Sequence, residues 1–129
     1  MRATELLALA VRARRAAYAP YSRFTVGAAL LAADGRVFTG CNIENASYGL
    51  TVCAERVALA KAVSEGVRSF SALAIAGPKT SITPCGACRQ VLAEFAPDLR
   101  VYWRGTGRRV VARSLRRLLP EGFRIGARR

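Results

Sequence analysis

Two short motifs contain residues that could form a metal site. Cys53-Ala54-Glu55 is followed about thirty residues later by Pro84-Cys85-Gly86-Ala87-Cys88. Thiolates are strong zinc ligands, and a zinc ion with three protein ligands keeps a fourth position open for water, as catalytic zinc does. The spacing therefore predicts a catalytic Zn²⁺ site formed by Cys53, Cys85 and Cys88.

A closed, structural zinc site is the alternative. The chain has four cysteines and no histidine, so Cys41 is the remaining thiol that could supply a fourth ligand. Cys41 falls in a segment expected to form a strand, where a buried core thiol is the simpler interpretation. We therefore expect Cys41 to stay outside the metal site.

Glu55 and Arg56 follow the first cysteine closely enough to act on the same site. Three thiolates give the zinc site a net charge of about −1, which opposes the acidification of water. Two helix N-termini and the Arg56 guanidinium could offset this charge. Glu55 is a candidate proton carrier. The structural alternatives are a glutamate that merely favours the helix dipole and an exposed surface arginine.

Both motifs are expected at helix starts. Residues 53–66 have an apolar inner face and end at a glycine, and Pro84 is suited to open a second helix that runs to about residue 96. Cys85 and Cys88, three residues apart in a first turn, then project to one side.

The remaining elements are expected to complete a mixed sheet. An amphipathic helix is expected over residues 2–18, and Asp34-Gly35 predicts a hairpin. The expected strands are residues 24–33, 36–43, 71–76, 100–104 and 108–112.

The end of the chain decides the direction of the last strand. The connection after Arg104 is too short for a parallel crossover, so the last two strands should be antiparallel. Ser114 is expected to cap a final helical turn that Pro120 ends. The whole pattern predicts an α/β fold, with about five strands between helices, in a single domain over residues 1–129.

Positive charge gathers near the C-terminus. The chain has 21 Lys+Arg against 8 Asp+Glu, a net charge of +13, and the last thirty residues hold ten arginines and one acid. Such an excess can bind nucleic acid. The middle of the chain is nearly balanced, however, and a solvated basic face also explains the excess. We expect no nucleic-acid partner.

The cysteines and the apolar runs indicate the cellular compartment of the protein. The apolar run Leu6–Val11 is too short for a signal-peptide core, and no run reaches membrane-spanning length. Without an export signal, the cysteines are better suited to metal binding than to disulfides. We expect a cytoplasmic protein without a membrane partner.

Further stretches carry a resemblance to a known family. They are Tyr18-Ala19-Pro20-Tyr21-Ser22 with Phe24, Gly40 to Tyr48, and Leu118-Leu119-Pro120 with Phe123. Together with the two cysteine motifs, they make the chain resemble the small homotetrameric zinc-dependent cytidine deaminases over essentially its whole length. The resemblance implies a three-layer α/β/α cytidine-deaminase-like fold. It also implies hydrolysis of cytidine and 2′-deoxycytidine to uridine and 2′-deoxyuridine plus ammonia, in pyrimidine salvage.

The resemblance assigns roles in substrate binding. Asn42 and Glu44 would hold the ribose 3′-hydroxyl, although alone they suggest a turn residue and a solvated charge. Phe24 would form a wall against the nucleoside. The alternative is that Phe24 is a core aromatic residue at the start of a strand. The backbones of Ala54 and Thr83 would read the cytosine edge.

Glu55 would move protons from water to ring nitrogen N3 and then to the departing amine.

The resemblance also implies pockets shared between chains. In a homotetramer, Phe123 and the segment from Ala46 to Tyr48 would reach a neighbour's pocket. The alternative for Phe123 is that it seals the core of its own chain.

Three rival functions share part of this pattern. A deaminase of nucleic acid must flip its base or bind a single strand, and the antiparallel ending and the absence of histidine argue against it. A zinc-stabilised RNA-binding module would not need Glu55. A deaminase of a cytosine-containing antibiotic is less consistent with the complete segment from Asn42 to Tyr48.

Overall fold

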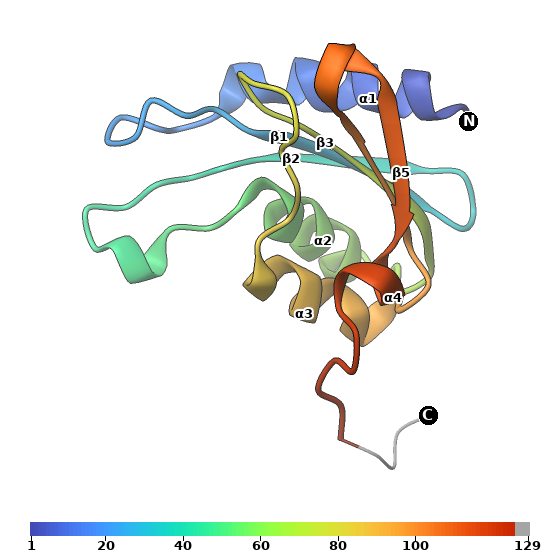
Figure 1. Cartoon of the computed structure of the whole chain (residues 1–129). Helices are drawn as coiled ribbons and strands as arrows, with labels where there is room; N and C mark the ends of the chain where they lie inside the picture. Colours follow the sequence, from blue (N-terminus) through green and yellow to red (C-terminus); the bar gives the residue numbers. More distant parts are fainter. Residues whose placement is uncertain (126–129) are drawn as a thin grey trace.

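A five-stranded mixed sheet forms the middle of the protein in the computed structural model (Figure 1). The strand order is β2-β1-β3-β4-β5. β3 pairs with β4 in parallel, and the other neighbouring pairs are antiparallel, as expected for the last two strands. The strands are β1 (Gly27–Ala32), β2 (Val37–Cys41), β3 (Phe70–Ala76), β4 (Arg100–Arg104) and β5 (Val110–Ser114).

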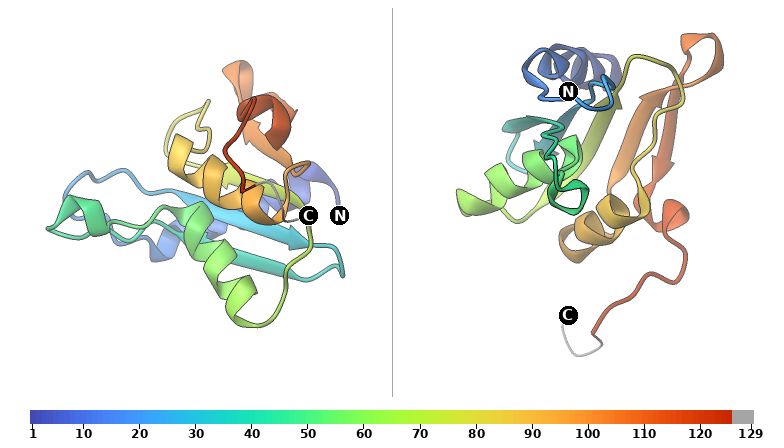
Figure 2. Two further views of the ribbon diagram at one scale, coloured as in Figure 1. Left: turned by 90° about the horizontal axis from the view of Figure 1, so that it is seen from below. Right: turned by 90° about the vertical axis from the view of Figure 1, so that its left-hand side faces the viewer.

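Helices cover both faces of this sheet. α1 (Ala3–Ala13) lies on one face, and α2 (Ala54–Ser64) and α3 (Gly86–Phe95) lie on the other (Figures 1 and 2). α4 (Leu115–Leu118) follows β5. The predicted three-layer α/β/α architecture is therefore confirmed. The structure describes residues 1–125, so the last four residues of the expected domain lie outside the described residues.

Alternating residue size in β3 explains how two layers pack on one strand. Ala72 and Ala74 face the core under α1, whereas Leu73 and Ile75 face the core under α2 and α3. Successive strand residues point to opposite faces, so the small side chains allow α1 to approach closely and the large ones fill the other core.

Two glycines bring helices onto the β1–β2 hairpin. A Cβ atom at Gly27 would overlap the backbone of Ala10 in α1. A Cβ at Gly40 would overlap Ala54 O and Ala58 N in α2. The second contact matters for function, because it fixes the start of α2 against the end of β2.

Some expected boundaries are wrong. The opening helix ends at Ala13, followed by a 3₁₀ turn over Arg14–Ala16, instead of continuing to residue 18. Its end is set by the next segment, because Tyr18 N donates to Asn42 O and Glu44 N donates to Tyr18 O, at 3.0 Å and 2.8 Å. This bonding holds the chain extended, and the first strand then begins at Gly27 rather than Phe24.

The other corrections concern helix starts and the last turn. Pro84 lies before α3, and Cys85 is the N-cap residue. The last strand begins at Val110 because a 3₁₀ turn over Thr106–Arg108, with Gly107 at φ 68°, lengthens the connection. Ser114 caps α4 as expected, since its hydroxyl accepts a hydrogen bond from Arg117 N. Among residues 1–125, no helix combines the length and the hydrophobicity needed to cross a membrane.

Candidate active site

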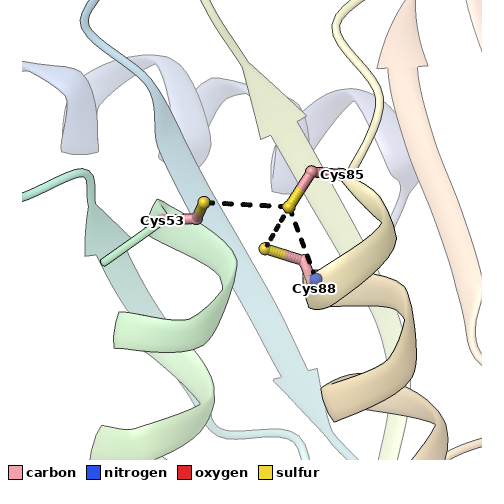
Figure 3. Close-up of side chains that lie close together, drawn as sticks. All are labelled: Cys53, Cys85 and Cys88. Carbon is pink, nitrogen blue, oxygen red and sulfur yellow. Dashed lines mark hydrogen bonds between the residues drawn. The ribbon is translucent and has the colours of Figure 1, made fainter. Parts of the chain in front are cut away.

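The three cysteines of the two motifs meet between the starts of α2 and α3 (Figure 3). Their sulfur atoms all lie within 4.8 Å of one another. The Sγ atoms of Cys53 and Cys85 are 3.9 Å apart, and those of Cys85 and Cys88 are 3.5 Å apart. A tetrahedral zinc ion with Zn–S bonds of about 2.3 Å would separate two sulfurs by about 3.8 Å. The cluster therefore fits Zn²⁺.

Helix geometry produces this cluster. Cys53 and Cys85 are the N-cap residues of α2 and α3, where the first backbone N–H groups have no partner inside the helix, although the Cys53 side chain itself makes no capping hydrogen bond. Cys88 N donates to Cys85 Sγ at 3.5 Å. Both helix dipoles therefore present partial positive charge to the sulfurs and favour thiolates.

Arg56 adds a full positive charge to this cluster. Its Nη2 donates to Cys53 Sγ at 3.6 Å, and its Nε is buried without a hydrogen-bond partner among the described residues. The nearby Cys88 thiol, together with Arg56, lowers the pKa of Cys53 to about 5. The neighbouring Cys53 thiolate, together with burial, raises the pKa of Cys88. Arg56 therefore contacts a thiolate rather than lying free on the surface.

Glu55 is buried in the first turn of α2, with 4% of its surface exposed. Burial, reinforced by the nearby Cys53 thiolate, raises the pKa of Glu55 to about 7, although hydrogen bonds and the Arg56 charge act in the opposite direction. A glutamate that served only the helix dipole would gain nothing from burial, because removing a carboxylate from water disfavours its charged form. A buried carboxyl beside a metal cluster can instead accept and return protons.

Cys41 lies at the end of β2, outside the sulfur cluster. It is a free, half-buried thiol rather than the fully buried core residue expected from the sequence. The end of β2 is only partly covered, which explains its exposure.

Asn42 is buried directly after β2. Its Oδ1 accepts from Val26 N at 2.9 Å, and its Nδ2 donates to Phe24 O at 2.8 Å. These bonds fix the backbone on both sides of Thr25. Phe24 itself is half-buried, close to Gly77 and Ile82 in the loop that leads to Cys85.

Glu44 holds the preceding loop by its carboxylate. It accepts hydrogen bonds from Tyr21 N at 2.9 Å, from Ser22 N at 3.1 Å and from the Ser22 hydroxyl. The hydrogen bond from the Ser22 hydroxyl contributes most to lowering the pKa of Glu44. Glu44 is therefore a fixed anion rather than a freely solvated charge.

A backbone bridge joins this segment to the metal motif. Ile43, which lies between Asn42 and Glu44, pairs with Val52, the residue before Cys53. The Ile43 N to Val52 O distance is 2.9 Å, and the reverse bond is 3.0 Å. The structure thus brings the expected ribose-binding residues beside the start of α2.

The residues expected at the base edge flank the sulfurs. Ala54 is fully buried as the first residue of α2, and Thr83 is exposed two residues before Cys85. Their backbones lie on the two motifs that meet at the cluster, so one small molecule could contact both.

The residues expected to serve a neighbour are exposed. Tyr48 and Phe123 each have 75% of their surface exposed, and Ala46 is exposed as well. Tyr48 meets Tyr21 edge-on, with ring centroids 6.4 Å apart. Phe123 borders a cavity of about 800 Å³ between α3, α4 and the residues that follow, and none of the cysteines lines this cavity. Phe123 therefore does not seal the core of its own chain.

Comparison with known proteins agrees with this geometry. Residues 1–103 match the family model described as the cytidine and deoxycytidylate deaminase zinc-binding region. The chain belongs to this family. A cytidine deaminase of Halalkalibacterium halodurans is 54% identical over 120 residues, covering 92% of this chain and 91% of the relative. A cytidine deaminase of Sporosarcina psychrophila is 51% identical over 121 residues, covering 92% of this chain and 89% of the relative.

A solved structure of the family has the same fold. The crystal structure of cytidine deaminase from Burkholderia pseudomallei is 50% identical, with a TM-score of 0.90. The match covers 95% of this chain and all of that one.

Some contacts of this deaminase are not evident from the sequence. Ser22 secures Glu44 although it lies 22 residues away, and Arg89 joins the adjacent residues Thr83 and Pro84 to Leu118, which lies 29 residues beyond Arg89. Ser22 belongs to a stretch that carries the resemblance and Arg89 directly follows the second cysteine motif, but no residue pattern identifies their partners. Only the folded chain brings these groups together.

Proposed function

We propose that this chain hydrolyses the C4 amine of cytidine and 2′-deoxycytidine, giving uridine or 2′-deoxyuridine and ammonia. The observation that carries this function is a buried carboxyl, Glu55, next to a three-thiol cluster at two helix starts. The relatives named cytidine deaminase, at about half identity over nearly the whole chain, support it.

Cys53, Cys85 and Cys88 would hold the zinc ion. When bound, zinc acts as a Lewis acid that lowers the pKa of water and so supplies a nucleophile at neutral pH. The two helix N-termini and Arg56 would stabilise the three thiolates. All four cysteines are free thiols, which suits a reducing compartment such as the cytoplasm and a role in pyrimidine salvage.

Glu55 would transfer the protons of the reaction. Its carboxylate accepts a proton from the attacking water and delivers it to ring nitrogen N3, which makes C4 more electrophilic. The water oxygen bonds to C4, and its remaining proton then passes through Glu55 to the amine, which leaves as ammonia as the C4–N4 bond breaks and the C4 carbonyl forms. Burial supports this role because it keeps bulk water from competing for the proton.

The nucleoside would be held from three sides. Asn42 and Glu44 would bind the ribose 3′-hydroxyl, Phe24 would pack against the nucleoside, and the backbones of Ala54 and Thr83 would read the base edge. The Ile43–Val52 bridge supports this arrangement, since it joins the ribose segment to the metal motif.

The remaining wall would come from other copies of the chain. We propose a homotetramer in which Tyr48, the neighbouring Ala46 and Phe123 close a neighbour's pocket. Exposure of large apolar side chains on the surface supports this assembly. The most exposed of these side chains include Tyr48, Leu50, Phe123 and Ile125.

A spectrophotometric assay tests the function. Purified zinc-loaded protein should convert cytidine and 2′-deoxycytidine, measured as loss of cytidine absorbance and release of ammonia. Protein carrying Glu55→Gln serves as the matched control. Zinc-loaded protein that leaves both nucleosides unchanged would refute the proposal.

A further inference from the structure

The guanidinium of Arg89 joins two segments that are far apart in the sequence. Its Nε donates to Pro84 O at 2.8 Å, and its Nη1 donates to Leu118 O at 2.8 Å. Its Nη2 also donates to Thr83 Oγ1 at 3.4 Å. Three donor nitrogens of one side chain thus fasten the loop before Cys85 to the end of α4.

The acceptors of Arg89 are neutral. Among the described residues, no carboxylate forms an ion pair with Arg89, whereas Arg116 in α4 pairs with Asp98 at 2.8 Å. The planar guanidinium suits this geometry because its donors point in fixed directions, which a lysine cannot reproduce. A partly buried arginine bound only to neutral oxygens serves to hold backbone in place rather than to balance charge.

The next residue extends the link to the C-terminal segment. Gln90 Nε2 donates to Phe123 O at 2.9 Å. Arg89 and Gln90 directly follow Cys88, so the helix that carries two of the cysteines is bound to both Leu118 and Phe123.

The position of the loop gives this link a consequence for substrate. Thr83 is exposed and lies two residues before Cys85, so a molecule bound at the sulfur cluster meets this loop. Arg89 holds the Thr83 side chain and the carbonyl of the following residue, which together set the direction of the Thr83 backbone.

We propose that Arg89 is a positioning residue that aligns the Thr83–Pro84 backbone for the base of the nucleoside. This inference rests on the proposed function. It assigns Arg89 an effect on substrate binding, through the loop, that is separate from metal binding by the cysteines.

Steady-state kinetics of Arg89 variants test the proposal. Arg89→Ala should raise the KM for cytidine roughly tenfold or more, as expected for loss of charge-assisted hydrogen bonds, with a smaller change in kcat. Zinc content should stay near one ion per chain. Arg89→Lys should recover part of the KM effect, because it keeps the charge and can reach one acceptor.

Two further variants separate the contacts. Arg117→Ala removes an exposed arginine one residue before Leu118 and should leave KM unchanged within about twofold, the range of ordinary surface substitutions. Gln90→Leu removes only the bond to Phe123 and should raise KM less than Arg89→Ala. An unchanged KM in folded Arg89→Ala, or zinc lost together with activity, would overturn the proposal. If Arg89→Ala does not fold, the KM for cytidine and the zinc content of Arg89→Lys test the proposal instead: a raised KM with zinc retained supports it, and an unchanged KM overturns it.

Hydrogen exchange provides a readout that does not depend on turnover. In Arg89→Ala, the backbone amides of residues 82–85 and 118–123, apart from Pro84 and Pro120, should exchange faster than in Arg117→Ala. Unchanged exchange in both segments would overturn the role of Arg89. Failure of the unsubstituted protein to deaminate cytidine would refute the proposed function instead.

Discussion

Around the sulfur cluster, one chain supplies buried groups from two helix starts, whereas at Tyr48 and Phe123 it leaves aromatic side chains in solvent. Glu55 is 4% exposed, but Tyr48 and Phe123 are each 75% exposed. The first region needs fixed distances and burial, which packing of α2 and α3 on the sheet provides. The second region would need another surface to cover its aromatic side chains, because a domain of 129 residues has little surface with which to enclose a nucleoside. The difference fits the proposed arrangement, in which the single chain supplies the catalytic groups and a neighbouring copy would enclose the substrate.

Removing a metal ligand should have the largest effect. Cys85→Ala should lose most bound zinc and cytidine turnover, and it should be less stable, because metal binding also stabilises the fold. Metal analysis and thermal unfolding measure these changes. Cys41→Ala, which alters a thiol outside the cluster, is the control and should keep its zinc. Zinc retained in the first variant and lost in the second would reverse the ligand assignment.

Removing the proton carrier should leave the metal site intact. Glu55→Gln should keep zinc and fold but lower kcat by about 10²- to 10⁴-fold, the usual contribution of general acid–base catalysis. Glu65→Gln, an exposed change at the other end of α2, should have no effect. Near-normal turnover of Glu55→Gln would remove this residue from the mechanism.

Loss of the proposed ribose contact should lower activity on nucleosides but not on free cytosine. Glu44→Ala should raise the KM for cytidine roughly tenfold, because a hydrogen bond to a charged group is lost. Any weak activity on free cytosine should stay unchanged. Ser22→Ala, which removes one partner of Glu44, should have a smaller effect. Equal losses on cytidine and cytosine would indicate a damaged fold rather than a ribose site.

A mixing experiment tests whether enclosure belongs to the assembly. Phe123→Ala, which lacks the wall, and Glu55→Gln, which lacks the proton carrier, should each be impaired alone. Co-refolded in equal amounts, they should place both intact parts in roughly a quarter of the sites, by random pairing across symmetric interfaces. No recovery of activity, or a monomer by light scattering, would contradict the shared pocket.

The sequence placed the starts of the two helices at the sulfur cluster to within about two residues, because short-range rules apply there. Cysteines three residues apart in a first turn must lie on one side, whatever the rest of the fold. The last two strands were also predicted correctly, since a short connection allows only antiparallel pairing.

A longer-range contact explains the wrong end of the opening helix. The helix expected to reach residue 18 ends at Ala13 because Tyr18 pairs with Asn42 and Glu44, which lie more than twenty residues away. The hydrogen bonds of Arg89 to Leu118 and of Ser22 to Glu44 span 29 and 22 residues. Helical periodicity carries no information about such partners, so only the tertiary structure identifies them.

The smallest effect is expected from salt. Three arginines, Arg113 on β5 and Arg116 and Arg117 on α4, lie at the edge of the sheet opposite β2. Arg113 and Arg117 are exposed there, and Arg116 pairs with Asp98. Cytidine is uncharged, so its binding releases no counterions, and kcat/KM should change less than about twofold between about 50 and 200 mM salt. A substrate held by phosphate contacts would instead lose several orders of magnitude in affinity over this range.

Deamination of a cytosine-containing single strand should be undetectable by the same ammonia assay. Conversion of such a strand to uracil at the nucleoside rate, with a steep salt dependence, would make the basic edge part of the substrate site.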